Sequence, residues 1–292
     1  MNWKRFYMVT IALATYGVVS AQANLLNAKK VEAIGVKTQA QIDSDDEKPL
    51  PYGYISDRDV LWSKVVWEFV DLNQKINLPY YYPIDTTSTS NSRRSLFNTL
   101  MKGIKDRRIT EVYQDSYFTT KIGPEEVKTM TFSEREIDGG EAQGGYNDIY
   151  TVDSQDIKGY LIKGIWYFDK RQGELKYRML ALAPMGPDVQ VMGVDEIDDS
   201  DNLYELFWVF FPDARDVLHE SKVFNPKNSA HPISYDNLLN ARRFNSTIVK
   251  EENLYGDRKI ADYIRGNSLF QLLEADRIKE GIRNREMDMW NY

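Results

Sequence analysis

Apolar residues recur at helical spacing in the first structured part of the chain. The segment begins with Ser56–Asp59, which has the pattern of a capping box with Asp in place of the usual Glu or Gln. The apolar residues that follow lie on one helical face: Trp62, Val65, Val66, Phe69 and Ile76. This spacing predicts a helix that ends near Asn77. The next segment, Leu78–Pro83, contains proline at positions 79 and 83 and is predicted to be extended.

Further along, the pattern changes from helical to strand-like spacing. We expect a helix over 93–106 with Leu96, Phe97, Leu100 and Ile104 inward, a strand over 109–119, and a short helix that opens at Pro124. Residues 85–92 and 139–145 are rich in Thr, Ser or Gly and are predicted to be loops. The clearest β signal consists of two runs, 160–168 and 175–183, which are joined by a short loop that ends in Gly173 and predict a hairpin.

The C-terminal third predicts one more strand and several helices. Leu203–Phe211 is apolar at nearly every position, so we expect a central strand with both faces covered, which ends before Pro212. The remaining expected elements are short helices over 213–220 and 234–244, and a helical segment over 258–282 that breaks at 266–267, where Ser268 caps the last helix.

Together these elements predict an α+β fold with a mixed or antiparallel sheet, a central hairpin, and helices on the N- and C-terminal sides. There is no tandem repeat and no linker of the kind that separates domains. We therefore expect a single domain over 51–292, preceded by a flexible, polar leader over 24–50 that ends in an acidic run and two prolines.

The first 23 residues have the three-part layout of a secretory signal peptide. Lys4 and Arg5 precede the apolar stretch Val9–Val19, and the small residues of Ser20–Ala23 form an A-x-A cleavage site. A membrane anchor needs about 20 apolar residues, and this stretch is shorter. The layout predicts export to a bacterial periplasm or to the exterior, with no membrane anchor in the mature chain.

Composition narrows the chemistry that this chain can perform. It has 37 Lys+Arg, 44 Asp+Glu, a formal net charge of −7, two His and no Cys. Without cysteine there is no disulfide, no thiolate metal site, no cysteine nucleophile and no cysteine-linked lipid. The modest acidic balance argues against a dedicated nucleic-acid binder, which would carry a basic patch.

No motif in the sequence supports catalysis or a cofactor. Gly159 and Gly164 have the spacing of a phosphate loop, but Ile165 stands where lysine is required. His219 begins a zinc-protease pattern that fails at Val223. The best cation candidate is a group of acids that suits either calcium or, more simply, a solvated loop: Asp195, Glu196, Asp198, Asp199 and Asp201. We therefore predict no catalytic, cofactor or metal site.

Aromatic residues supply the remaining candidates. Trp166 and Trp208 are predicted to belong to the core of the sheet, whereas three consecutive tyrosines and the aromatic C-terminus are harder to bury. Tyrosine and tryptophan are enriched at protein interfaces, because each combines a large apolar area with a polar tip. The candidate interface residues are Tyr80, Tyr81, Tyr82, Trp290 and Tyr292. A local packing clamp and a sugar-binding platform remain alternatives.

Long and unusual blocks of sequence resemble one protein family. They extend from about residue 50 to the last residue without large gaps. The blocks are Leu50–Tyr54, Leu61–Lys64, Asn77–Pro83, Arg93–Phe97, Gly164–Arg178 (GIWYFDKRQGELKYR), Leu206–Arg215, Ala241–Asn245 and Met287–Tyr292. In these blocks the chain is similar to the gliding-motility protein family GldN, called PorN in oral relatives.

The resemblance implies a non-enzymatic subunit of the type IX secretion system of Bacteroidetes-type bacteria. Members of that family are periplasmic, pair with an outer-membrane lipoprotein (GldK/PorK), and form a ring beneath the outer membrane. The resemblance also implies that the ring meets the periplasmic part of an inner-membrane motor component (GldM/PorM), and that in gliding species the machine exports surface adhesins. The alternatives to this interpretation are a periplasmic glycan- or peptidoglycan-binding protein and a carboxylate-dependent glycan hydrolase.

Overall fold

The computed structural model describes residues 48–84, 93–137, 146–192, 202–223, 225 and 233–289. Contacts divide the chain into two units, residues 1–48 with 86–92 and residues 49–85 with 93–292, and every element below belongs to the second unit. Several predicted features lie outside the described residues. They are the signal peptide, most of the leader, the loops predicted at 85–92 and 139–145, and the acidic group at 195–201.

One antiparallel sheet organises the fold. Its strands follow the order β11, β1, β5, β6, β8, β2, and β7 pairs with the end of β6. The strands are β1 (Val60–Asp71), β2 (Val112–Tyr113), β5 (Gly159–Asp169), β6 (Glu174–Gly186), β7 (Tyr204–Glu205), β8 (Trp208–Phe210) and β11 (Thr247–Glu251). The predicted α+β class and the central hairpin, β5–β6, are confirmed.

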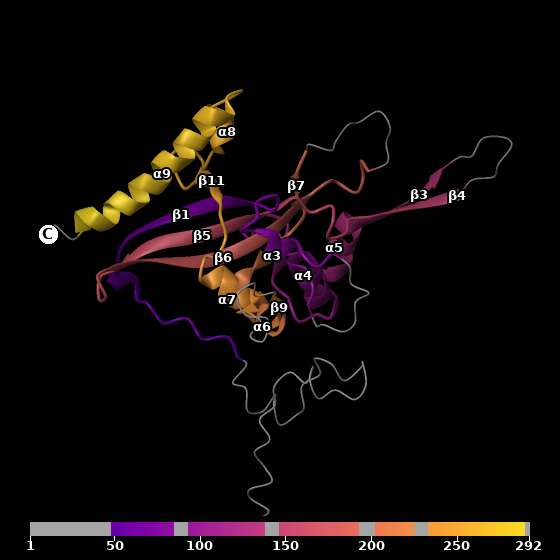
Figure 1. Cartoon of the computed structure of the whole chain (residues 1–292), viewed down its shortest axis with the longest axis horizontal. Coiled ribbons are helices and arrows are strands. Elements are labelled where there is room, and N and C mark those ends of the chain that lie inside the picture. Colours follow the sequence, from indigo (N-terminus) through magenta and orange to yellow (C-terminus); the bar gives the residue numbers. More distant parts are fainter. Residues whose placement is uncertain are drawn as a thin grey trace, which may run out of the picture. The chain divides into compact units, whose positions relative to one another are not determined.

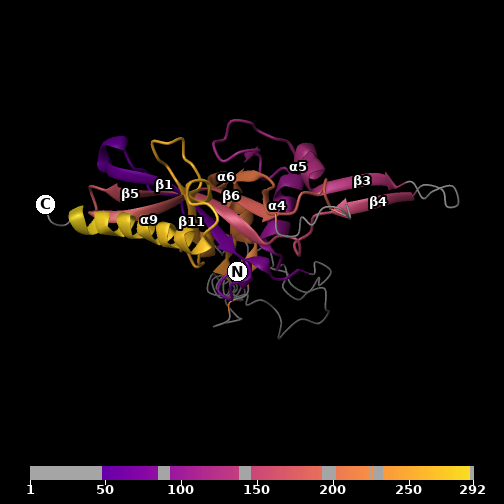
Figure 2. The same cartoon turned by 90° about the horizontal axis from the view of Figure 1, so that it is seen from above.

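Two small ribbons pair apart from this sheet. One joins β3 (Phe132–Ile137) to β4 (Tyr146–Thr151), and the other joins β9 (Lys222–Val223) to β10 (Ile233–Ser234). Figure 2 shows the β3–β4 ribbon extending away from the long strands. Neither ribbon was predicted from the sequence.

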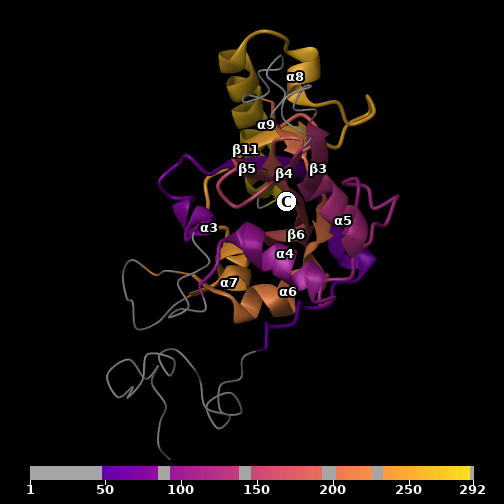
Figure 3. The ribbon, with the colours of Figure 1, turned by 90° about the vertical axis from the view of Figure 1, so that its right-hand side faces the viewer.

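The helices form two groups, with the long strands running between them (Figures 1 and 3). Helices α4, α6 and α7 lie on the side of β6, and α8 and α9 lie beyond the edge strand β11. The helices are α3 (Leu78–Tyr81), α4 (Leu96–Lys105), α5 (Pro124–Thr131), α6 (Phe211–Glu220), α7 (Tyr235–Asn240), α8 (Ile260–Tyr263) and α9 (Ser268–Met289). Among the described residues, no helix has both the length and the apolar character that crossing a bilayer requires.

The register of the long strands assigns residues to two faces of the sheet. Ile162 pairs with Leu182, whereas the neighbouring Leu161 pairs with Ala183 and with Phe69. Because successive side chains point to opposite faces, these pairs mark two different surfaces. We call the surface that carries Ile162 and Leu182 the first face, and the surface that carries Phe69, Leu161 and Ala183 the second face.

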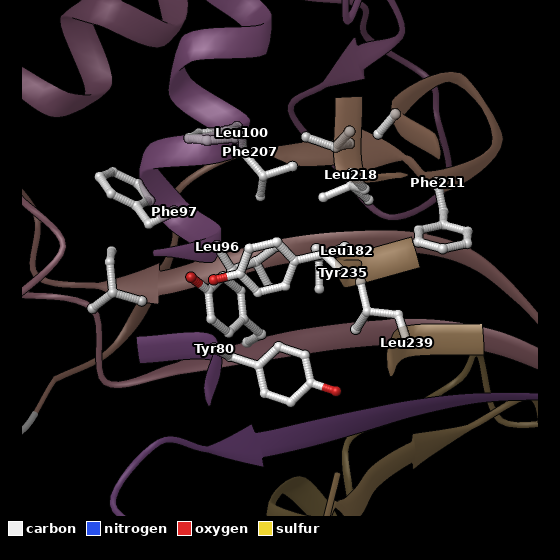
Figure 4. Packing of buried hydrophobic residues seen from close by; sticks show 14 of the residues in the cluster. Tyr80, Leu96, Phe97, Leu100, Leu182, Phe207, Phe211, Leu218, Tyr235 and Leu239 are labelled. Carbon is white, nitrogen blue, oxygen red and sulfur yellow. The ribbon is translucent and has the colours of Figure 1, made fainter. Parts of the chain in front are cut away.

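The first face carries the main apolar core. Side chains from α4, α6 and α7 gather over the long strands in Figure 4, where Leu100 lies near Phe207 and Leu182 lies near Tyr235. The largest fully buried side chains of this cluster include Tyr80, Tyr160 and Tyr235. Burying a Leu or Phe side chain contributes about 1.5–3 kcal/mol, so this cluster is the principal source of stability.

The first predicted helix is wrong, because residues 60–71 form the long strand β1. Only Asp57–Asp59 forms a short 3-10 turn, in which Ser56 makes no side-chain cap. The segment is rich in Val, Trp and Phe, which favour strands. Val66 and Trp67 are both buried, on opposite sides of the strand, so the sequence lacks the alternation of a half-exposed strand and its apolar run also fits a helical spacing.

The prediction of an extended segment at 78–83 is also wrong. Leu78–Tyr81 forms helix α3, with Pro79 in its first turn. Proline is well tolerated there, because the N–H that it lacks has no partner within the helix. Tyr82, directly before Pro83, follows the helix with an extended backbone.

Most of the other helix predictions are confirmed. Helix α4 buries the four predicted residues, α5 opens at Pro124, and the C-terminal helices break at Gly266–Asn267. The last helix is capped by Asn267, whose side chain accepts the Phe270 N–H, and not by Ser268.

The strands predicted beside the hairpin are shorter than expected. The strand expected over 109–119 is reduced to β2, and the one expected over 203–211 divides into β7 and β8. Strand β8 is buried but lies next to the short edge strand β2 and not at the centre of the sheet.

Candidate functional site

The three consecutive tyrosines have three different environments. Tyr80 is only 1% exposed and packs against Tyr235 and Phe244, so it belongs to the core and is removed from the candidate interface. Tyr81 is half-buried, and its hydroxyl donates to the carbonyl of Gln155 at 3.4 Å. Tyr82 is 54% exposed, with its ring edge-on to Tyr81 at 4.9 Å. Only Tyr81 and Tyr82 are therefore available for a surface contact.

The other candidate aromatic residues also differ from one another in burial. Trp208 is fully buried, as predicted, and its Nε1 donates to a carboxylate oxygen of Glu205 at 3.0 Å. Trp166 is half-buried and packs on the cluster beneath α9, so it is not a residue of the main core. Trp290 and Tyr292 lie outside the described residues, and their interface role stays a prediction.

The rejected motifs lie where the sequence analysis expected. Gly159 and Gly164 lie within β5, and a Cβ at Gly164 would collide with the Tyr177 ring. This glycine is therefore explained by close packing. His219 lies on α6, with its Nδ1 3.9 Å from a carboxylate oxygen of Asp236. In the ranges that the structure describes, no group of three or more His, Asp or Glu residues is placed to share a metal ion.

The first two turns of α9 expose a row of large apolar side chains. Leu269, Phe270, Leu272 and Leu273 are between 47% and 62% exposed, and we call these four residues the α9 ridge. The helix meets the sheet only further on, through Ala275, Ile278 and Ile282. Because full burial contributes about 1.5–3 kcal/mol per side chain, leaving four of them half-exposed forgoes roughly 3–6 kcal/mol. An exposed apolar row of this size is typical of an interaction surface.

A groove adjoins the ridge on the side of the second face. Its volume is about 690 Å³. Phe69, Leu161 and Met185 contribute from the long strands, and Leu269 and Leu272 contribute from α9. We call this hollow the second-face groove. Leu203 and Val249 also line it and are only partly buried, so apolar area on this face of the sheet stays open to solvent.

A second hollow of about 520 Å³ lies on the other side of the ridge. Phe270 and Leu273 line it, together with Tyr263 of α8. Charged side chains around both hollows pair with one another. Lys259 lies 3.2 Å from a Glu205 oxygen, and Arg277 donates to Glu274 through two nitrogens. The hydrogen bond from Arg277 lowers the pKa of the Glu274 carboxyl.

A different cavity, of about 420 Å³, lies between the second half of α9 and the sheet. Glu68, Trp166, Arg242 and Ser246 line its inner side. Glu68 is 2% exposed, and its carboxylate accepts hydrogen bonds from Arg242 at 2.7 Å and from the Ser246 hydroxyl. Arg242 lies over the Trp166 ring at 5.0 Å. A charged pair beside an aromatic ring in a hollow is an arrangement that suits a polar organic ligand.

The second face also buries a lysine. Lys163 is 8% exposed, donates to the carbonyl of Ser116 at 2.7 Å and lies over the rings of Trp67, Tyr117 and Phe118. Burial lowers the pKa of Lys163, and the positive charge of Lys250 lowers it further. The lysine anchors the turn at 116–118 on this face.

Arginines hold the segment that enters the domain. The carbonyls of Leu50, Gly53 and Tyr54 accept hydrogen bonds from three arginines, Arg215 at 2.7 Å, Arg178 at 3.0 Å and Arg171 at 3.2 Å. The Tyr52 ring packs against the guanidinium groups of Arg178 and Arg215. Leu50 and Tyr54 point to solvent, so this pinned segment adds a further apolar surface.

The ridge and the second-face groove were not predicted from the sequence. The signal for the ridge was present as LFQLL at 269–273, directly before the buried positions 275, 278 and 282. A helix that buries a single face needs apolar residues only every three or four positions. Four apolar residues within five positions therefore place some of them outside the buried face. The groove left no comparable signal, because its lining residues come from seven separate elements and their connections.

Comparison with known proteins gives one positive result. The family described as "Gliding motility associated protein GldN" matches residues 55–291, which cover nearly all of the described domain. A search of curated proteins finds no match. The family is a component of gliding motility and not a known enzyme family. The match confirms the resemblance found in the sequence, and the chain belongs to the GldN family of gliding motility associated proteins.

Proposed function

We propose that this protein is a non-enzymatic structural subunit of the type IX secretion and gliding machinery. It acts in the periplasm, where it forms a ring with the outer-membrane lipoprotein GldK/PorK, meets the periplasmic region of GldM/PorM, and supports export of surface adhesins. The observation that carries the proposal is the GldN family match over residues 55–291. The signal-peptide pattern supports the location.

The surface of the domain supports a role in assembly. A subunit that contacts a lipoprotein, a motor component and two ring neighbours needs several separate interaction surfaces. The described residues offer three apolar surfaces: the α9 ridge, the pinned segment with Leu50 and Tyr54, and the Tyr81–Tyr82 pair. The ridge lies on a helix and the pinned segment is held by three arginines, so a partner gains apolar burial there with little ordering cost.

Co-purification with the lipoprotein tests the proposal. The mature chain is expected to recover GldK/PorK from cells in comparable amounts, and Tyr82→Ala is expected to reduce that recovery. Tyr255→Ala is the matched control, because Tyr255 is also exposed and lies in a different loop. Thermal melting of each variant reports whether the fold is intact. A wild-type chain that never recovers the lipoprotein contradicts the proposal.

A second candidate function is glycan binding, which the cavity beneath α9 favours. Trp166 offers a ring face, and Glu68 and Ser246 offer polar atoms in the same hollow. Sugars combine an apolar ring face with hydroxyls, so they match this lining. If this candidate is correct, isolated cell wall retains the purified chain without any partner, and Trp166→Ala releases it, whereas Tyr255→Ala does not. No retention by cell wall would reject it.

A further inference from the structure

The α9 ridge and the second-face groove are immediate neighbours. Leu269 and Leu272 belong to the ridge and also form one wall of the groove. The same patch therefore carries a projecting apolar row and, beside it, a hollow of about 690 Å³ that accepts apolar side chains. Adjacent projecting and hollow parts are what a patch needs in order to pair with an identical patch about a two-fold axis.

Charge favours a second copy over a strongly charged partner. The formal net charge of the chain is −7, so two copies meet only where the local charge is balanced. Within the second-face groove it is balanced, because the lining carries one base and one acid, Lys259 and Glu205, which lie 3.2 Å apart. Two identical patches therefore come together without bringing unpaired like charges into contact.

We propose that two copies of this chain pair through the first two turns of α9, with the ridge of each copy in the second-face groove of the other. The two α9 helices run antiparallel across the two-fold axis. This contact closes on itself, whereas ring neighbours need two different surfaces. The proposal is therefore independent of the proposed ring, and either one can fail while the other holds.

Analytical ultracentrifugation of the mature chain without partners tests the pairing. We expect a reversible monomer–dimer equilibrium, and Leu272→Glu is expected to raise its dissociation constant by about 30-fold or more, as for a central interface residue. Met287→Glu is the matched control, because Met287 is exposed to a similar extent near the other end of the same helix. It is expected to leave the equilibrium unchanged. Equal effects of the two variants would contradict the proposal.

Single cysteines test the symmetry directly, since the natural chain contains none. Under mild oxidation, Leu272→Cys is expected to form a disulfide-linked dimer, because equivalent positions meet across a two-fold axis. Met287→Cys is expected to stay monomeric. A wild-type chain that remains monomeric at every concentration overturns the proposal. If that monomeric chain binds the lipoprotein and Leu272→Glu abolishes the binding, the groove is assigned to the lipoprotein instead.

Discussion

The two faces of the sheet are formed by the same long strands, but different parts of the chain cover them. On the first face, helices α4, α6 and α7 cover a core in which Leu100, Tyr160 and Leu182 are almost fully buried. On the second face, Phe69 stays partly exposed, and the cover comes largely from the turn around Phe118 and from Leu203. The same strands therefore carry a closed core on the first face, and on the second face a smaller buried cluster whose margin at Phe69 opens into the groove.

This difference separates what folds the domain from what the domain offers to other molecules. Removal of apolar surface from water is the main favourable term in folding. On the first face, nearly all of the apolar surface is already buried by other parts of the same chain. On the second face, the groove beside α9 retains apolar area that the chain itself does not bury and that a partner can cover. Substitutions should therefore damage stability on the first face and association on the second.

The largest effect is expected at the buried ion pair on the first-face side of β1. Arg242→Met leaves the Glu68 carboxylate, which is 2% exposed, without its charged partner. Breaking a buried pair from one side costs about 3–5 kcal/mol, because the remaining charge is still desolvated. Urea unfolding measures this loss. The double variant Glu68→Met/Arg242→Met should recover most of it, and a double variant as unstable as Arg242→Met would contradict the explanation.

A smaller difference is expected between apolar truncations on the two faces. Leu182→Ala opens a cavity in the closed core and should lower the free energy of unfolding by about 2–5 kcal/mol. Phe69→Ala removes a larger side chain, but one that already borders the groove. It should cost less, since part of that surface faces solvent. Chemical denaturation of both variants makes the comparison, and a greater loss for Phe69→Ala would contradict the contrast between the faces.

The smallest effect concerns Lys163 and alkaline pH. Its pKa in the folded state lies below the ordinary value of 10.5, because it is buried and lies near Lys250. At lower pH the side chain is charged in both states, and the burial penalty is fully present. As pH rises through the folded pKa towards 10.5, the folded state releases this proton first, so stability rises. Lys163→Met should lack this rise when unfolding is followed between pH 8 and 10.5, and an identical slope in both proteins would contradict it.

The sequence predicted the elements whose signals are local. The β5–β6 hairpin was recognisable because two β-rich runs flank a short loop ending in Gly173, and α4 because its four inward residues have helical spacing. Strand β1 was misread because Val66 and Trp67 are buried on opposite sides, which removes the alternation of a strand. Burial on both sides depends on partners distant in the chain, and no local pattern reports it.

The candidate site was less accessible from sequence than the fold. Tyr80 and Tyr82 have the same side chain two positions apart, yet one is core and the other surface, because α3 turns the first towards Tyr235. The second-face groove joins residues from 69 to 272 that only the tertiary structure brings together. Recognition of the family needed no geometry, since it rested on whole blocks of sequence such as Gly164–Arg178.

Particle imaging of the mature chain, with and without the outer-membrane lipoprotein GldK/PorK, tests the central claim most directly. The claim is that this protein works as a structural subunit through the surfaces it offers to neighbours. It predicts large closed rings when the lipoprotein is present and only small species when it is absent. A chain that stays separate from the lipoprotein, with no particles larger than a pair of copies, would contradict it.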